Sequence, residues 1–125
     1  MSERPSPTPV ELAILQALWD LGPSTVRQVH NALRAERDAG YSTTLKMVQV
    51  MTEKGLLQKD DSVRPQVYRP AQAREKTQLR LIDELIQRAF AGSASELVLR
   101  AASAKRISPG ELAEIKKLIE RAKDR

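Results

Sequence analysis

Three glycines divide the first part of this chain into short helical segments. Gly22, Gly40 and Gly55 each end a stretch in which apolar residues recur every three or four positions, the spacing of one face of an α-helix. A chain interrupted this often cannot form one long helix, so the pattern predicts three short helices that pack together. Two runs that favour short strands, LLQKD and QVYRP, follow the last glycine and flank the polar turn DSVRP.

The expected helix ends follow from small polar residues placed before each apolar segment. The candidate N-caps are Thr8 for the first helix, Ser24 or Thr25 for the second, and Ser42 or Thr43 for the third. Gly55 suits the end of the third helix, where a positive φ is needed. The positions expected to face inward are Leu12, Leu15, Leu18, Trp19, Val26, Val29, Leu33, Thr44, Met47, Val48 and Met51. Three helices closed by a hairpin make a winged helix-turn-helix.

Prolines mark the expected divisions of the chain. Three of them within residues 1–9 predict a flexible arm, and Pro70 separates a winged-helix domain, residues 10–70, from a helical region, residues 71–125. Three amphipathic stretches, separated by Gly92-Ser93 and Ser108-Pro109, predict further helices at residues 74–90, 93–104 and 108–124. The expected fold class is mainly α with a small two-stranded β-wing.

The charge of the chain favours an anionic partner. Its net charge is +5 and its pI is about 9.8, which points first to nucleic acid. Residues 1–70, however, carry nine Lys/Arg against eight Asp/Glu, whereas residues 71–125 carry twelve against eight. A DNA-reading surface in the first part must therefore be a local patch. The few aromatic residues argue against binding of single strands by base stacking.

Cysteine is absent, which excludes disulfides and thiolate metal sites and favours a reducing compartment. No apolar run approaches the ~20 residues that span a bilayer. The N-terminal residues MSERPSPTPV lack the apolar core of a signal peptide. We therefore expect a cytoplasmic protein that does not insert into a membrane.

Catalytic signatures are missing from the sequence. His30 is the single histidine, lies in the second helix without metal-ligand spacing, and is expected to be a surface or half-buried residue. Phosphate-binding loops, nucleophile elbows and HExxH motifs do not occur. We expect no enzyme activity, no cofactor and no metal.

The third helix is the candidate recognition helix, because the second helix of a helix-turn-helix enters the major groove. The side chains expected to face the groove are Ser42, Thr43, Leu45, Lys46, Gln49 and Val50. The side chains expected near phosphates are Ser24 and Thr25 at the start of the second helix, Lys54, and Arg64 in the wing. The alternative for each is that it faces water only.

Apolar stripes on the last three helices predict a homodimer, since about fifty residues are too few to bury them alone. The stripe residues are Leu79, Ile82, Leu85, Ile86, Phe90, Leu97, Val98, Leu112, Ile115, Leu118 and Ile119. A dimer would place two recognition helices about one DNA turn apart, which suits a palindromic operator. The alternative is that these helices pack back onto the first domain.

The chain resembles the penicillinase-repressor family of bacterial transcription regulators, the BlaI/MecI type, which also includes copper-responsive repressors. The resemblance covers residues 10–123 and rests on four stretches: ELAILQALWDLGPSTVRQVHNAL, YSTTLKMVQVMTEKGLL, VYRP, and LIDELIQRAFAGSASELVL with ISPGELAEIKKLIERA. It implies a winged helix that binds operator DNA, a C-terminal homodimerisation region, and repression of a promoter. In antibiotic-responsive members, a membrane sensor metalloprotease controls cleavage in the dimerisation region and so releases the DNA.

Three positions depart from that family pattern. The best-known members carry an arginine where this chain has Val50, so an arginine–guanine contact is missing and the operator can differ. Their asparagine–phenylalanine cleavage site corresponds to Arg100-Ala101 here, which argues against the same protease specificity. The copper-responsive members end in a cysteine motif, and this chain has no cysteine.

Two other functions are compatible with the residues. A winged helix can dock a protein instead of DNA, and the near-neutral charge of residues 1–70 is the best support for that alternative. A DNA-binding activator is the other, because the sign of regulation depends on the position of the operator. The salt dependence of binding separates the first alternative from DNA binding. The affinity for DNA falls steeply with salt, because binding releases counterions from the DNA.

Overall fold

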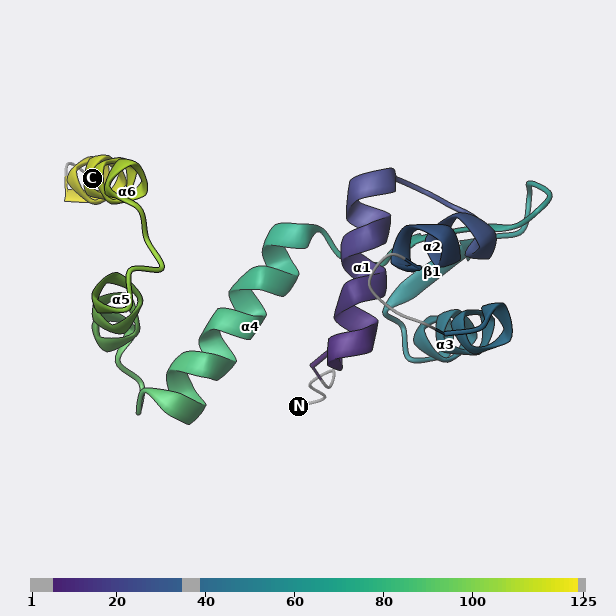
Figure 1. Ribbon diagram of the computed structural model, residues 1–125, viewed down its shortest axis with the longest axis horizontal. Helices are drawn as coiled ribbons and strands as arrows, with labels where there is room; N and C mark the ends of the chain where they lie inside the picture. Colours follow the sequence, from purple (N-terminus) through teal and green to yellow (C-terminus); the bar gives the residue numbers. More distant parts are fainter. Residues whose placement is uncertain (1–5, 35–38, 124–125) are drawn as a thin grey trace. The chain divides into compact units, whose positions relative to one another are not determined.

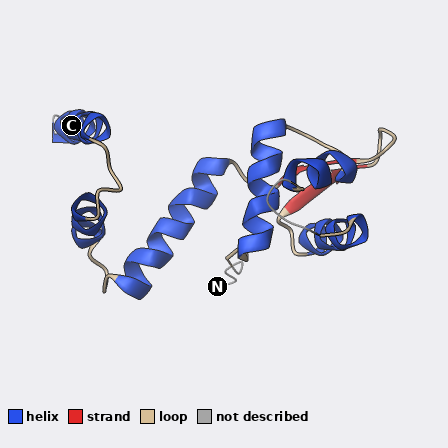
Figure 2. Ribbon diagram, in the orientation of Figure 1, coloured by secondary structure: helices blue, strands red, loops and turns tan. Residues whose placement is uncertain are grey.

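The computed structural model describes residues 6–34 and 39–123. Contacts within the chain divide it into two compact units, Met1–Leu79 and Arg80–Arg125. The elements run in the order α1 (Pro9–Leu21), α2 (Val26–Leu33), α3 (Tyr41–Glu53), β1 (Leu57–Asp60), β2 (Val67–Pro70), α4 (Arg74–Ala89), α5 (Ala94–Ser103) and α6 (Pro109–Lys123) (Figure 1). Three helices followed by an antiparallel hairpin form a winged helix-turn-helix, and the predicted fold class is confirmed (Figure 2).

One apolar core holds the first unit together. It consists of Ile14, Leu15, Leu18, Val26, Val29, Val48, Met51, Leu57 and Tyr68. The buried side of α1 is centred on Glu11, Ile14, Leu15 and Leu18, so Leu12 and Trp19 lie at its edge and are half-buried. Leu33 and Met47 are likewise half-buried and pack against the core from its rim.

His30 lies deeper than the sequence predicted. It was expected at the surface or half-buried, but it is only 9% exposed. Its Nδ1 lies 2.9 Å from the hydroxyl of Thr44 on α3, and its ring meets Tyr41 edge-on at 5.7 Å between centroids. Burial is possible because the polar ring nitrogen has a partner inside the protein.

The first two helices begin with reciprocal capping boxes. Thr8 Oγ1 accepts from Glu11 N at 3.2 Å while Glu11 Oε1 accepts from Thr8 N at 3.0 Å. Thr25 and Gln28 make the same pair of bonds at the start of α2. Of the two caps predicted for that helix, Thr25 is therefore the one used.

The predicted cap of α3 was wrong. The N-cap is Gly40, which has no side chain to bond the helix, and Ser42 and Thr43 lie exposed in the first turn. The helix begins earlier because Tyr41 packs against the core, with the guanidinium of Arg27 over its ring at 4.0 Å. If Ser42 or Thr43 were the N-cap, Tyr41 would precede the first turn and would not belong to the helix.

A glycine with a left-handed backbone ends α3. Gly55 follows the C-cap residue Lys54 and has φ +84°. The Gly55 N–H donates to the Thr52 carbonyl at 3.1 Å and the Leu56 N–H to that of Met51 at 2.9 Å, which is a Schellman motif. This motif reverses the chain into β1, as the sequence predicted.

The hairpin pairs Leu57 with Pro70 and Asp60 with Val67, and the turn between its strands projects away from the helices (Figure 1). A third segment joins it, because Ser24 forms two backbone hydrogen bonds with Tyr68, of 3.0 and 2.8 Å. The start of α2 is thereby attached to the wing. A further bond joins α1 to the residues that follow β2, because Nε1 of Trp19 donates to the backbone carbonyl of Gln72 at 3.2 Å.

The second unit contains the rest of α4 together with α5 and α6. The predicted breaks between these helices are confirmed. Ser93 Oγ accepts from Glu96 N at 3.1 Å, and Ser108 and Glu111 form a capping box at the start of α6. Among the described residues, no helix combines the length and the apolar character needed to cross a bilayer.

Truncation of Leu18 tests the core. Leu18 is 1% exposed and Leu21, also in α1, is 52% exposed. Leu18→Ala is expected to lower the free energy of unfolding by about 2–5 kcal/mol, because it leaves a cavity. Leu21→Ala, the matched control, should change it by no more than about 0.5 kcal/mol. Urea unfolding followed by the fluorescence of Trp19, the single tryptophan, measures both; equal losses would contradict this core.

Candidate nucleic-acid interface

One side of α3 is buried and the opposite side faces solvent. Thr44, Val48 and Met51 are buried against the core. Because successive residues of a helix are rotated by about 100°, the opposite side is formed by residues spaced four, three and four apart. These four exposed residues, called the outer stripe below, are Ser42, Lys46, Gln49 and Glu53.

Glu53 was not among the residues predicted from the sequence. It lies one turn beyond Gln49 on the same side, and its spacing from Lys46 and Gln49 was the signal that could have identified it. Its carboxylate adds a negative charge to a stripe otherwise composed of a cation and neutral polar groups. A carboxylate repels phosphate, but it can accept a hydrogen bond from the amino group of cytosine.

The flanks of the outer stripe are less exposed than predicted. Thr43 is exposed, but Leu45 and Val50 are half-buried, and Leu45 packs against the core. Val50 was expected on the exposed side of the helix. Leu45 and Val50 therefore offer only part of their apolar surface to a partner.

Ser24 is not exposed, contrary to its predicted place near phosphates. It is 2% exposed, and its hydroxyl donates to the Gly22 carbonyl at 2.7 Å. Since its backbone also pairs with Tyr68, Ser24 fastens α2 to the wing. Thr25 is half-buried and caps α2, so the positive end of the helix dipole lies at this position.

Lys54 forms an ion pair inside the protein. Its Nζ lies 2.7 Å from Oε2 of Glu11, a residue only 2% exposed. Burial raises the pKa of the Glu11 carboxyl, but the Lys54 ammonium and the hydrogen bonds from Thr8 outweigh it, and the net pKa is lowered. Lys54 was predicted to lie near phosphate; in the structure its ammonium neutralises a buried carboxylate and ties the end of α3 to α1, and its side chain is 43% exposed.

The wing carries three exposed cationic side chains, Lys59, Arg64 and Arg69, of which only Arg64 was predicted. Arg64 lies in the turn. Lys59 lies opposite Tyr68 in the hairpin, so the two side chains share one face of the wing. Arg69 lies on the other face, where its Nε donates to Oε1 of Gln58 at 3.1 Å. Arg27 on α2 is a further exposed cation that was not among the predicted residues.

A polar hollow lies between α3 and the wing. It is lined by Gln49, Thr52, Glu53, Lys59, Gln66 and Tyr68. The structure thus brings Gln49 of the outer stripe and Lys59 of the wing, which are ten positions apart in the chain, to the same hollow. An arrangement of this kind can present hydrogen-bonding groups and a cation to the same partner.

Helices α4, α5 and α6 expose large apolar side chains. Of the residues predicted to mediate dimerisation, Leu79, Ile82, Leu85, Val98, Leu112, Leu118 and Ile119 are 38–61% exposed, while Ile86, Phe90, Leu97 and Ile115 are half-buried. Leu99, at 64%, was not predicted. Arg100 and Ala101 lie within α5, with Arg100 exposed and Ala101 half-buried.

Comparison with known proteins confirms the family resemblance. A family profile described as Penicillinase repressor matches residues 7–121. The protein named Transcriptional regulator BlaI, from two strains of Mycobacterium tuberculosis (CDC 1551 / Oshkosh and ATCC 25618 / H37Rv), is 36% identical over 86 residues. That match covers 67% of this chain and 62%, less than two thirds, of the relatives' length.

A solved structure of a MarR family protein from Bacillus stearothermophilus also matches. It is 24% identical and superposes with a TM-score of 0.45, over 79% of this chain and 71% of that chain.

Removing Lys54 tests the buried ion pair. Lys54→Ala is expected to lower the free energy of unfolding at pH 7 by about 1–3 kcal/mol, because it leaves the Glu11 carboxylate buried without its cation. Lys46→Ala, an exposed lysine on the same helix, should change it by no more than about 0.5 kcal/mol. Trp19 fluorescence in urea measures both variants, and equal effects would contradict the structural role of Lys54.

The same pair predicts a pH dependence. The pKa of Glu11 lies below its ordinary value of 4.5 in the folded state, so its stabilisation is present above pH 4.5 and is lost as the pH falls through the folded pKa. The stability difference between the parent protein and Lys54→Ala should therefore shrink on acidification below pH 4.5. A difference that stays constant down to pH 3 would show that Glu11 is not the partner, since an unperturbed glutamate, with a pKa of about 4.3, is mostly protonated at that pH.

Proposed function

The chain belongs to the penicillinase repressor family, and from this premise we propose that it is a cytoplasmic, homodimeric DNA-binding repressor of a palindromic operator. The observation that carries the proposal is the outer stripe of α3. The core fixes the buried side of this helix, and the other side presents a serine, a lysine and a glutamine at helical spacing. These side chains hydrogen-bond base edges and phosphates.

Each residue of the recognition helix has a distinct role in this proposal. Ser42 and Thr43, in the first turn, bond base edges or phosphates, and Lys46 meets guanine or phosphate. Gln49 has the amide that pairs with adenine. The half-buried apolar edges of Leu45 and Val50 contact thymine methyl groups.

Phosphate contacts come from both sides of α3. The N-terminus of α2, capped by Thr25, favours an anion through its dipole and backbone amides. On the wing, Arg64 lies in the exposed turn and Lys59 lines the hollow beside Gln49. Lys54 supports binding indirectly, because its ion pair with Glu11 sets the position of the end of α3.

Dimerisation follows from the exposed apolar side chains of α4, α5 and α6, which a second copy of the chain would cover. Two linked reading heads bind more tightly than one, since the second binds at a high effective concentration. Cleavage in the second unit would remove this linkage and release the operator. A membrane sensor protease acting at Arg100-Ala101 would need a specificity for this bond and local unfolding of α5, because that bond lies inside a helix.

Docking of a protein by the winged helix is a second candidate, favoured by two observations. Residues 1–70 carry nine basic against eight acidic side chains, and Glu53 lies on the outer stripe. The salt dependence of binding separates this candidate from DNA recognition. Measuring transcription from the target promoter with and without the protein distinguishes an activator from a repressor.

DNA from upstream of the protein's own gene tests the proposed function, measured against a scrambled duplex at 50 and 200 mM salt. We expect preference for the upstream DNA and a steep loss of affinity, by roughly 10³-fold or more if six phosphates are neutralised. Equal binding of both duplexes at both salt concentrations would contradict operator recognition by this sequence. Weak salt dependence would favour a protein partner.

Lys46→Ala tests the outer stripe. If Lys46 meets a phosphate, the variant should bind all sequences more weakly and reduce the slope of log K against log salt by about 1. Lys116→Ala, which removes an equal charge from an exposed position on α6, is the matched control and should leave the slope unchanged. An affinity and slope equal to the parent's for Lys46→Ala would place this residue outside the interface.

Val50→Arg tests the edge of the recognition helix. A guanidinium at this position can bond the O6 and N7 atoms of guanine, so the preferred base at one position of each half-site should shift to guanine by about 1–3 kcal/mol of discrimination. Selection from randomised duplexes measures the change. An unaltered operator profile in a folded variant would show that position 50 does not face the groove.

A further inference from the structure

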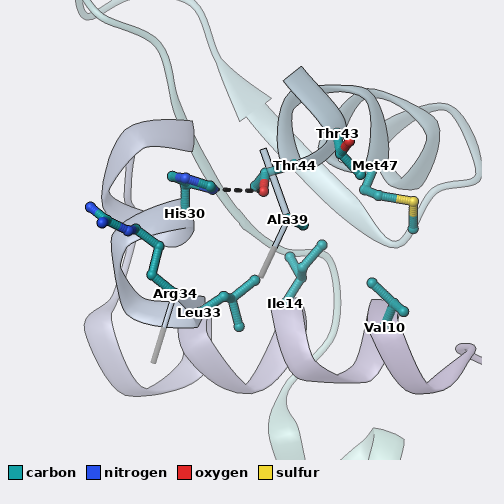
Figure 3. A pocket seen from close by; sticks show the side chains of 9 residues that line it. All are labelled: Val10, Ile14, His30, Leu33, Arg34, Ala39, Thr43, Thr44 and Met47. Atoms are coloured by element: carbon teal, nitrogen blue, oxygen red, sulfur yellow. Dashed lines mark hydrogen bonds between the residues drawn. The ribbon is translucent and has the colours of Figure 1, made fainter. Parts of the chain in front are cut away.

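A cavity of about 160 Å³ lies between α1, α2 and α3. Figure 3 shows its walls, which include Val10 and Ile14 of α1, His30 and Leu33 of α2, and Thr44 and Met47 of α3. Four of these six side chains are aliphatic or a thioether. The cavity is distinct from both the packed core of the first unit and the outer stripe of α3.

Three of the four polar side chains in the cavity wall are already occupied or turned away, and the fourth, Thr43, is at an exposed position. The Nδ1 atom of His30 and the hydroxyl of Thr44 lie 2.9 Å apart and satisfy each other. In Figure 3 the guanidinium of Arg34 points away from the other side chains of the wall. The surface that remains is formed by Val10, Ile14, Leu33 and Met47, and is apolar.

We propose that this cavity binds one small, neutral, apolar molecule, of about the size of benzene. The cavity opens to solvent at the exposed residues Arg34, Ala39 and Thr43, and the apolar walls behind them offer water few of the two to four polar partners that it needs, while apolar cavities of about 150 Å³ accept benzene or xenon. A charged ligand would lose its hydration without gaining a counter-charge. The volume and the lining therefore both select a compact, uncharged ring or chain.

The site has a direct connection to the recognition helix. Thr44 and Met47 belong to α3, so an occupant touches the helix that carries the outer stripe. The small molecule can bind with one affinity to the free protein and with another to the protein whose α3 holds a partner. The ratio of these two affinities is then also the factor by which the small molecule changes the affinity for that partner. The ligand site itself does not depend on what that partner is.

The methionine methyl groups offer a test without DNA. Met47 lines the cavity, whereas Met51, one turn further along α3, is fully buried in the core and serves as the internal control. In the methyl-labelled full chain, titration with benzene should shift the Met47 signal saturably, with a Kd of roughly 1 mM, and the Met51 signal far less. Xenon, which is smaller and inert, should shift the same signal.

Filling the cavity is the matched variant experiment. Val10→Phe places a ring where the ligand would lie and should abolish the response of Met47, while Gln16→Phe, on the exposed side of α1, should retain it. A Met47 response that is absent with both benzene and xenon, that rises linearly without saturation, or that survives in Val10→Phe would overturn the proposal. If Val10→Phe does not fold, the benzene and xenon titrations of the unaltered protein decide alone.

Discussion

The direction in which α3 presents its side chains depends on three buried residues, Thr44, Val48 and Met51. Rotation of the helix by one residue, about 100°, toward the side of Leu45, Gln49 and Thr52 would expose Val48 and Met51 and bury the Gln49 side chain, which costs roughly 1–3 kcal/mol if its amide is left unpaired. The composition of the outer stripe is therefore a consequence of core packing. The outer stripe and the buried residues are two sides of one helix, so a rotation of α3 would change both together.

Two polar contacts then fix the recognition helix and the wing within the first unit. The ion pair between Glu11 and Lys54 ties α1 to the end of α3, where Gly55 turns the chain into β1. The backbone pairing of Ser24 with Tyr68 ties the start of α2 to β2. Since residues 1–70 are almost neutral, these contacts matter more than overall charge, because they bring Gln49 of α3 and Lys59 of the wing to the same hollow.

Features that depend on neighbouring residues were predictable from the sequence, whereas features that depend on distant ones were not. The helix breaks, the hairpin and the caps at Thr8, Ser93 and Ser108 follow from spacings of a few residues. The pairing of Lys54 with Glu11, the burial of Ser24 against the wing and the bond of His30 to Thr44 join residues 43, 44 and 14 positions apart. Local patterns placed Ser42, Lys46 and Gln49 on the exposed side of α3 but did not show the ion pair of Lys54 with Glu11, because a lysine near a helix end does not reveal which distant residue it meets in the fold.

A DNA-cleaving group attached to α3 tests most directly whether the outer stripe lies in the major groove. The chain has no cysteine, so Ser42→Cys creates a single attachment point for an iron chelate, and Leu21→Cys, exposed at the end of α1, provides the comparison. If α3 reads the operator as a dimer, cleavage from position 42 should fall at two sites about one helical turn apart, with the strand offset of a major-groove origin. Cleavage that is diffuse from position 42, or equal from positions 42 and 21, would contradict the placement of this helix in the groove.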